Sequence, residues 1–304
     1  MKDYLNIVND KYPIRRQEEQ KSEFRKYIIE ELEKSNFEVK EECLENKHTN
    51  ILIGDVDNAK VVFCAHYDTP AASIFPNLMM PRNVVLGMCY QFSYPILLSL
   101  ISLGIAFLFG GIFSLVYELI AAIYVVLYLT SFYLLTRFFD NKHNKNDNTS
   151  GVATILSLIE SCQRNDVGFI LFDNEEKGKL GSKAFSKAHK EFFESKLVIN
   201  LDCVGNGKHI LFVAKEEAEK LADYELLKNN VNNNDNYEVH FYPMKGSMSN
   251  SDYKNFNCGI SVMACKKFKF GYYTPRIHTK YDIEADSRNI EFLTIELNNY
   301  INKL

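Results

Sequence analysis

The segment VVFCAHYD, Val61–Asp68, is an apolar run that ends in a histidine and an acid. Two later segments share this design: FILFDNEE ends in Glu175 and Glu176, and VINLDCVG carries Asp202 behind its apolar residues. Short apolar runs of this length are typical of buried strands. In open α/β sheets, ligands bind outside the carboxyl ends of the strands. We therefore expect these polar side chains to converge on one site.

Helical and strand-like patterns alternate along most of the chain. Residues Gln17–Ser35 carry apolar side chains at helical spacing, and TSGVATILSLIESC predicts a second helix with Thr149 or Ser150 as its N-cap. The strand-like runs are Asn50–Ile53, Lys60–Ala65, Gly168–Phe172, Leu197–Leu201, His209–Val213 and Gly259–Ala264. The Asn-rich segment Lys228–Tyr237 is predicted to be a polar loop. The alternation predicts an α/β fold with a mostly parallel sheet covered by helices.

One long apolar stretch interrupts this pattern. No charged residue lies between Arg82 and Glu118, and a second uncharged run continues from Leu119 to Thr136. About 20 apolar residues suffice to cross a bilayer as a helix. The stretch is therefore predicted to form a transmembrane hairpin over residues 83–137, with a turn at Gly110-Gly111 and Glu118 near its tip. Tyrosines at 90, 94, 124, 128 and 133 add aromatic rings of the kind found at membrane interfaces.

An apolar helical pair buried in a soluble protein is the alternative, although such helices seldom lack charges over this length. If the hairpin spans a membrane twice, its basic flanks decide the orientation. These flanks carry Arg82, Arg137, Lys142 and Lys145, whereas the tip has no Lys or Arg. The positive-inside rule then predicts a cytoplasmic catalytic domain attached to the cell membrane.

Composition agrees with an intracellular location. The formal net charge is −4, from 35 basic and 39 acidic side chains that are interspersed, so the chain shows no nucleic-acid footprint. The seven cysteines form no CxxC pair, and their odd number favours a reducing compartment. The charged N-terminal stretch does not have the pattern of a signal peptide.

Five motifs in order make the chemistry more specific. They are AHYD, then DNTSGVA, then EEKGKLGS, then NLDCVG, then IHT. In this order they resemble the co-catalytic zinc aminopeptidases of the M28 metallopeptidase family, the bacterial leucyl aminopeptidase type. The resemblance covers nearly the whole chain outside the hairpin, including GSMSNSDYKNFNCGIS. It implies a three-layer zinc-exopeptidase fold, formed by residues 1–82 and 138–304.

The resemblance also implies roles for individual residues. One zinc ion would be held by His66 and Asp202, a second by Glu176 and His278, and both by a bridging Asp147. Zinc accepts imidazole and carboxylate ligands, although other divalent metals use the same ligands. Glu175 would be the general base, and Asp68 would hydrogen-bond the second ring nitrogen of His66.

The implied activity is removal of N-terminal residues from peptides. The position of the hairpin, between Asp68 and Asp147, adds the expectation that the peptides are hydrophobic or membrane-associated. Other reactions on the same scaffold, of the carboxypeptidase or glutaminyl cyclase type, and a non-catalytic membrane scaffold remain alternatives. Asp252 is interpreted as structural. The aromatic residues Phe268, Phe270, Tyr272 and Tyr273 line either a substrate pocket or the core. The remaining histidines, which show no partner pattern, are His48, His143, His189, His209 and His240.

Overall fold

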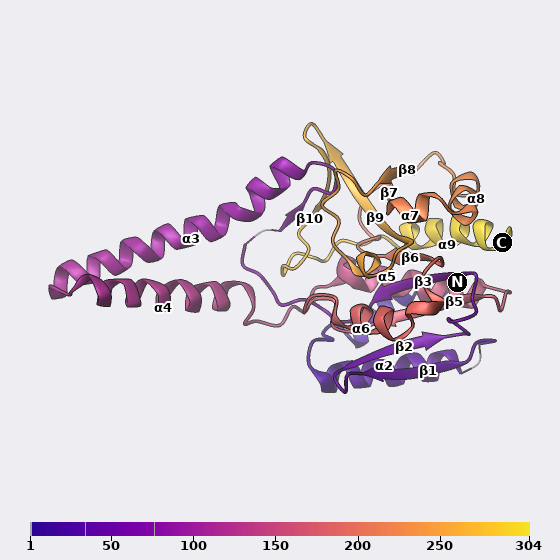
Figure 1. Ribbon diagram of the computed structural model, residues 1–304, viewed down its shortest axis with the longest axis horizontal. Helices are drawn as coiled ribbons and strands as arrows, with labels where there is room; N and C mark the ends of the chain where they lie inside the picture. Colours follow the sequence, from indigo (N-terminus) through magenta and orange to yellow (C-terminus); the bar gives the residue numbers. More distant parts are fainter. Residues whose placement is uncertain (1, 34, 76) are drawn as a thin grey trace.

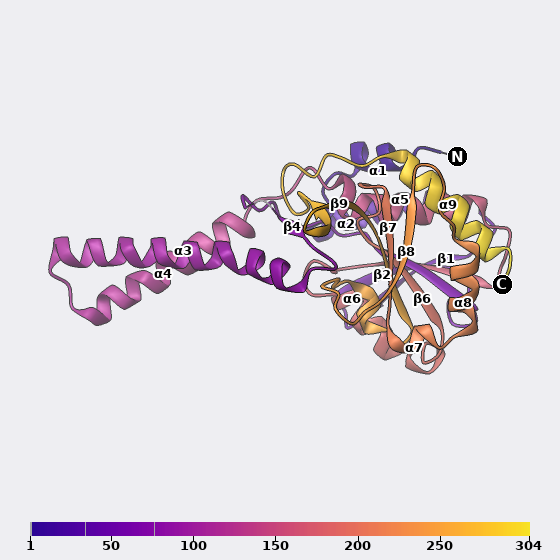
Figure 2. The same cartoon turned by 90° about the horizontal axis from the view of Figure 1, so that it is seen from above.

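The computed structural model describes residues 2–33, 35–75 and 77–304. A mixed sheet runs through the body of the protein, with helices on both faces (Figure 2). The strands are β1 (Val39–Leu44), β2 (His48–Ile53), β3 (Val61–His66), β4 (Leu78–Met79), β5 (Val167–Phe172), β6 (Leu197–Leu201), β7 (His209–Ala214), β8 (Glu238–Pro243), β9 (Gly259–Phe268) and β10 (Gly271–Pro275). The helices are α1 (Tyr4–Lys11), α2 (Glu18–Leu32), α3 (Val84–Phe113), α4 (Tyr117–Thr136), α5 (Ser150–Ser161), α6 (Leu180–Ala188), α7 (Glu216–Glu219), α8 (Ala222–Asn230) and α9 (Ser287–Ile301).

The centre of the sheet is parallel. Strand β3 pairs in parallel with β5 on one side and β6 on the other, and β6 pairs in parallel with β9. The flanks are antiparallel: β2 and β1 extend the sheet beyond β5, while β7 and β10 pair with β9. This topology confirms the predicted α/β fold with a mostly parallel central sheet, and it brings the carboxyl ends of β3, β5 and β6 together.

Alternation along each central strand divides the core. In β3, Val61 and Phe63 face the helical layer of α1, α2, α5 and α9, whereas Val62 and Cys64 face α6. The same period of two recurs in β5 and β6, because successive side chains of a strand point to opposite faces. Both faces are fully buried, which explains why these strands form continuous apolar runs in the sequence.

Six strand runs predicted from the sequence are present, with small shifts of their ends, and β1, β4, β8 and β10 were missed. The missed strands are short or lie toward the sheet margins, so their residues lack the continuous apolar pattern. Helix α2 forms as expected, with Gln17 and Gln20 making a reciprocal capping box. The predicted polar loop is shorter than expected, because α8 continues to Asn230.

The N-cap expected at Thr149 or Ser150 is not formed by either side chain. Helix α5 begins at Ser150, but the Oδ1 atom of Asn148 accepts the hydrogen bond from the backbone N–H of Gly151. The Ser150 hydroxyl instead donates to the carbonyl oxygen of Asn146. The cap is thus displaced into the turn that carries Asp147.

Helices α3 and α4 project from one side of the body and join at their far end (Figure 1). Both are long and apolar enough to cross a membrane, and most of their large apolar side chains are exposed. They are therefore not the buried core pair that was the alternative prediction. Glu118 lies exposed in the first turn of α4, near the tip.

The predicted turn at Gly110-Gly111 is wrong. Helix α3 continues through both glycines to Phe113, and the reversal follows at Ser114, which has a left-handed backbone. Gly110 instead allows close packing of the two helices, because a Cβ atom there would lie 2.3 Å from Cδ1 of Ile120. A small residue is required where helices approach this closely.

Candidate active site

The structure brings together the side chains that the sequence singled out. His66 ends β3, Glu175 and Glu176 follow β5, and Asp202 follows β6. The remaining two reach the same place from loops: Asp147 lies in the turn before α5, and His278 lies after β10. These residues line one cleft of about 710 Å³ at the carboxyl ends of the parallel strands.

Two sets of metal-type ligands share Asp147. In the first set, Nε2 of His66 lies 3.4 Å from Oδ1 of Asp147 and 3.8 Å from Oδ1 of Asp202. In the second, Nε2 of His278 lies 2.9 Å from Oδ2 of Asp147 and 3.3 Å from Oε1 of Glu176. Asp147 therefore turns one carboxylate oxygen toward each set.

These spacings fit bound divalent cations. Ligands that lie about 2.0–2.1 Å from a tetrahedral zinc ion are separated from one another by roughly 3.3–3.4 Å. In addition, Oε1 of Glu176 is buried and, although close to His278, accepts no hydrogen bond of acceptable geometry. A buried carboxylate oxygen without a hydrogen bond is costly unless a cation satisfies it.

Glu175 lies beside the first set. Its carboxylate is within 4.8 Å of the ligand atoms of His66 and Glu176. Burial, together with the nearby charge of Asp252, holds the pKa of the Glu175 carboxyl well above its usual range. Asp252 itself is fully buried: Ser182 donates a hydrogen bond to its Oδ1 atom, and burial raises its pKa to about 7. The carboxyl group of Glu175, which belongs to neither of the two ligand sets that share Asp147, thus lies next to them.

Charge at the centre of the site is dense. Burial alone would lower the pKa of His66, but the nearby carboxylates of Asp147, Asp202 and Asp68 outweigh it and raise the pKa. Burial likewise opposes ionisation of Asp147, yet His278 and His66 lower its pKa. The carboxylates thus favour the protonated form of His66, and the two histidines favour the ionised form of Asp147.

The Asp68 carboxylate lies beside His66, as its predicted role requires, but its closest partners are backbone groups. Its carboxylate oxygen lies 3.6 Å from Nδ1 of His66, and the closer partner of that nitrogen is the backbone carbonyl oxygen of Asp68, at 3.1 Å. The Asp68 carboxylate instead accepts hydrogen bonds from the backbone N–H groups of Glu175 (2.9 Å) and Glu176 (3.1 Å). The His66 ring is thus oriented by a carbonyl group, and Asp68 holds the acidic pair.

A second aspartate, missed by the sequence analysis, makes the same kind of contact. The buried carboxylate of Asp282 accepts hydrogen bonds from the backbone N–H groups of Asn146 (3.2 Å) and Asp147 (2.9 Å). Asp282 follows His278 by four positions, so the segment that carries one ligand also fixes another. Its place at the end of the stretch RIHTKYD, residues 276–282, was the available signal.

The sequence matches a known peptidase family. The model for peptidase family M28 matches residues 140–295, just over half of the sequence. The chain belongs to peptidase family M28. Its enzyme class is accordingly that of a zinc-dependent metallopeptidase, a hydrolase. No curated protein matches the chain.

Solved structures share the fold of this M28 peptidase. A Zn-dependent exopeptidase from Parabacteroides distasonis has 14% identity and a TM-score of 0.59, over 98% of this chain and 95% of that one. The Legionella pneumophila LapA aminopeptidase has 12% identity and a TM-score of 0.55, over 98% and 67% of the two chains. Porphyromonas gingivalis glutaminyl cyclase has 13% identity and a TM-score of 0.56, over 99% and 97%. Because the sequence identities are only 12–14%, these similarities show a shared fold and nothing further.

The M28 peptidase has a buried cation behind its acidic site that sequence reasoning also missed. Arg15 is fully buried, and its guanidinium donates to the carbonyl oxygen of Tyr67 and the hydroxyl of Thr149. Burial lowers its pKa to about 10, partly offset by the charges of Asp68 and Asp147. Arg15 thus connects the end of β3 to the turn that carries Asp147.

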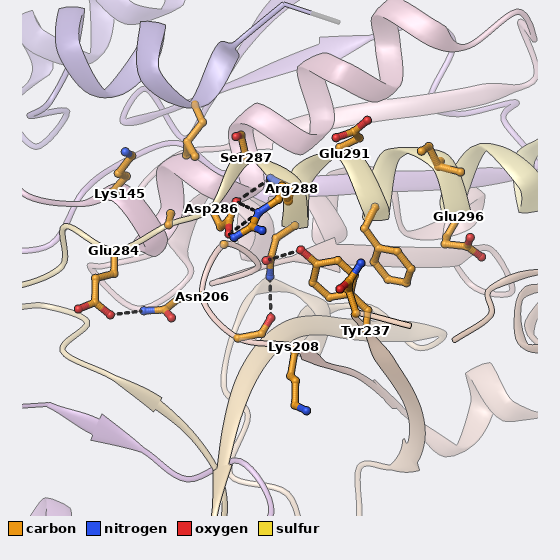
Figure 3. A pocket seen from close by; sticks show the side chains of 18 of the residues that line it. Lys145, Asn206, Lys208, Tyr237, Glu284, Asp286, Ser287, Arg288, Glu291 and Glu296 are labelled. Atoms are coloured by element: carbon orange, nitrogen blue, oxygen red, sulfur yellow. Dashed lines mark hydrogen bonds and ion pairs between the residues drawn. The ribbon is translucent and has the colours of Figure 1, made fainter. Parts of the chain in front are cut away.

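A larger cavity, of about 880 Å³, lies elsewhere, around the start of α9 (Figure 3). Its polar side chains pair with one another: Arg288 with Asp286, Asn206 with Glu284, and Tyr237 with Asn289. None of the metal-type groups formed by the described residues lies in it. The aromatic residues Phe268, Phe270, Tyr272 and Tyr273 are not among the described residues that line the catalytic cleft.

Proposed function

We propose that this M28 peptidase is a membrane-anchored di-zinc aminopeptidase that removes N-terminal residues from peptides held near the membrane. The observation that carries the proposal is the pair of ligand sets that share Asp147 beside the unengaged carboxyl group of Glu175. A single metal would leave one oxygen of Asp147 and one histidine without a ligand role.

Each of the predicted site residues has a part in this proposal. His66 and Asp202 would hold one ion, Glu176 and His278 would hold the other, and Asp147 would contribute an oxygen to each. With neutral histidines, the carboxylates of Asp147, Glu175, Glu176 and Asp202 carry a formal charge that two divalent cations balance. When bound, a pair of such ions lowers the pKa of a shared water molecule and polarises the scissile carbonyl.

The protein's own groups move the proton. Glu175 accepts a proton from the attacking water and returns it to the leaving amine, as a general base and then a general acid. Asp68 acts as a positioning residue, because its hydrogen bonds to the backbone of Glu175 and Glu176 fix the base relative to a metal ligand. Such placement raises the reaction rate, because the reacting groups are already oriented and lose less entropy in reaching the transition state.

Charge around the cleft favours binding of a peptide by its amino end. The interior is acidic, whereas Arg137 and Lys177, both exposed, also line the cleft. A positively charged N-terminus is attracted to the carboxylates, and the carboxyl-terminal part of a short peptide is attracted to the outer cations. This polarity supports an aminopeptidase over a carboxypeptidase.

Membrane anchoring is proposed from the hairpin. Residues 83–137 would span the membrane twice, and the discontinuous peptidase domain, residues 1–82 and 138–304, would lie on the cytoplasmic side with the basic flanks. Both helices reach the cleft: Gln91 of α3 and Tyr133 of α4 line it together with the metal-type residues. The cleft would therefore open beside the bilayer surface, and a membrane-associated peptide would be the preferred substrate.

The test uses the full chain in detergent and a peptide library. We expect stepwise loss of residues from the amino end, which stops when a chelator removes the metal. The variant Glu175→Gln should lower kcat by roughly 10²–10⁴-fold, because it cannot accept the proton, while its metal content stays unchanged. Release of ammonia from N-terminal glutamine, with peptide bonds intact, would indicate a cyclase. A protein that binds no zinc when zinc is supplied, and that cleaves no peptide, would indicate a scaffold.

A further inference from the structure

A second group of metal-type side chains lies outside the catalytic cleft. His209 begins β7, and Glu238 and His240 lie on β8. None of the three belongs to the catalytic ligand sets, and none lines the cleft. They meet because β7 and β8 pair in parallel with His209 opposite Glu238, and His240 lies on the same face two residues further on.

The spacing of their ligand atoms suits coordination of one ion. Nδ1 of His209 lies 3.3 Å from Nε2 of His240 and 3.4 Å from Oε2 of Glu238, and Nε2 of His240 lies 3.7 Å from the same oxygen. The two nitrogens are within hydrogen-bonding distance of each other, whereas both N···O distances exceed the 2.7–3.2 Å range of good N–H···O bonds. They are close to the roughly 3.3–3.4 Å edge of a tetrahedron of ligands around zinc.

The surroundings suit a partly open site. His209 is buried, whereas the side chains of His240 and Glu238 are 22% and 47% exposed, so an ion can enter from solvent. The other oxygen of Glu238, Oε1, lies 3.8 Å from the ammonium group of Lys208 and leaves Oε2 free to coordinate. The Tyr272 hydroxyl lies 3.5 Å from Nε2 of His240, at the side of the cluster.

We propose that His209, Glu238 and His240 form a second metal site that binds one borderline divalent transition metal, such as zinc, and joins β8 to β7. Two imidazoles and one carboxylate select such a metal over magnesium or calcium, which prefer oxygen ligands. Among the described residues, β8 pairs with β7 alone. A metal bound to both strands therefore holds an edge strand that follows the Asn-rich loop. The proposal is independent of what the catalytic cleft does.

The test compares metal binding by the full-length protein and its variants. Metal-free protein in detergent is titrated with zinc, and bound zinc per chain is measured. We expect His240→Gln to bind one equivalent less than the unaltered protein and to retain its peptidase activity. Loss of a group that only hydrogen-bonds a metal ligand typically lowers metal affinity by roughly 10–100-fold. If His240 is itself a ligand, its replacement should lower the zinc affinity of this site by more than that.

The matched control is His189→Gln. His189 also contacts two carboxylates, but Asp57 lies at its Nδ1 atom and Glu42 at its Nε2 atom, so the three groups do not converge. This variant should bind as much zinc as the unaltered protein. Glu238→Gln, which keeps the shape of the side chain, guards against misfolding of the histidine variant and should lose the same equivalent. The proposal would be overturned if all the proteins bound the same amount of zinc and zinc raised their Tm values equally. The three side chains would then form a hydrogen-bonded cluster only.

Discussion

Two buried aspartates support the acidic site through the backbone. Asp68 accepts hydrogen bonds from consecutive N–H groups at Glu175 and Glu176, and Asp282 does the same at Asn146 and Asp147. Each carboxylate thereby fixes the main chain of a segment that carries a candidate ligand, without using its own oxygens on the metal. Partners of this kind orient the ligands they support.

Removing the Asp282 carboxylate should weaken metal binding and folding together. In Asp282→Ala, two N–H groups in a buried turn lose their acceptor, and each such loss costs about 1–3 kcal/mol. The free energy of unfolding, from denaturant titration in detergent, should fall by about this amount. Zinc affinity, measured by titration of metal-free protein, should fall because Asp147 is no longer held in place.

A nearby surface acid provides the control. Glu284 lies on the same segment but pairs with Lys266 and Arg276 at exposed positions. Exposed ion pairs contribute about 0–1 kcal/mol, so Glu284→Ala should alter stability little and zinc affinity not at all. If Asp282→Ala bound zinc as tightly as Glu284→Ala, the supporting role of Asp282 would be wrong.

Among the elements, the hairpin is held together by a glycine contact near its tip and aromatic stacking nearer its base. Gly110 of α3 lies against Ile120 of α4, and Ser99 and Tyr124 share a hydrogen bond between the helices. The rings of Tyr94 and Phe132 stack across the two helices, with ring centroids 6.5 Å apart. In an apolar solvent, close packing and such hydrogen bonds are what holds helices together.

Replacing Gly110 by leucine should separate the helices at the tip. A side chain at this position would overlap Ile120, and overpacking costs about 1–3 kcal/mol. The thermal unfolding midpoint of the protein in detergent should therefore fall for Gly110→Leu. In Gly111→Leu the new Cβ atom meets no atom within 4 Å, so this variant should keep the midpoint or raise it. Equal midpoints for both variants would contradict the packing shown by the structure.

For the whole molecule, the hairpin and the catalytic cleft adjoin. The hairpin enters the chain between the segment that carries His66 and the turn that carries Asp147, and both of its helices line the cleft. Anchoring would therefore set the position of the site relative to the bilayer. A substrate confined to the same membrane would meet the site at a raised effective concentration.

Replacing residues 83–137 by a short loop should remove a preference for membrane-held substrates. In vesicles, the full protein should cleave a peptide with a free amino end and a lipid on its carboxyl end about 100-fold more efficiently than the same peptide without lipid, since tethering of this kind raises binding by such factors. The shortened protein should treat both peptides alike. Both proteins should cleave a soluble aminoacyl anilide equally, which verifies that the shortened protein folds. Retention of the preference without the hairpin would refute the membrane role.

The sequence by itself determined the α/β class, the central strands and the long apolar helices, because these are encoded in local periodicity and in uninterrupted apolar runs. It also singled out the side chains that meet in the cleft, since acids and histidines that directly follow parallel strands must gather at one sheet edge. The family motifs supplied the two loop residues, Asp147 and His278.

Contacts between distant segments were decided only by the tertiary structure. The packing of loops decides which backbone N–H groups donate hydrogen bonds to Asp68 and Asp282. The contact at Gly110 depends on how α4 packs against α3. The cluster of His209, Glu238 and His240 depends on the register of β7 against β8. Pairing register and loop packing are set by the summed interactions of the whole fold, so no local stretch of sequence specifies them.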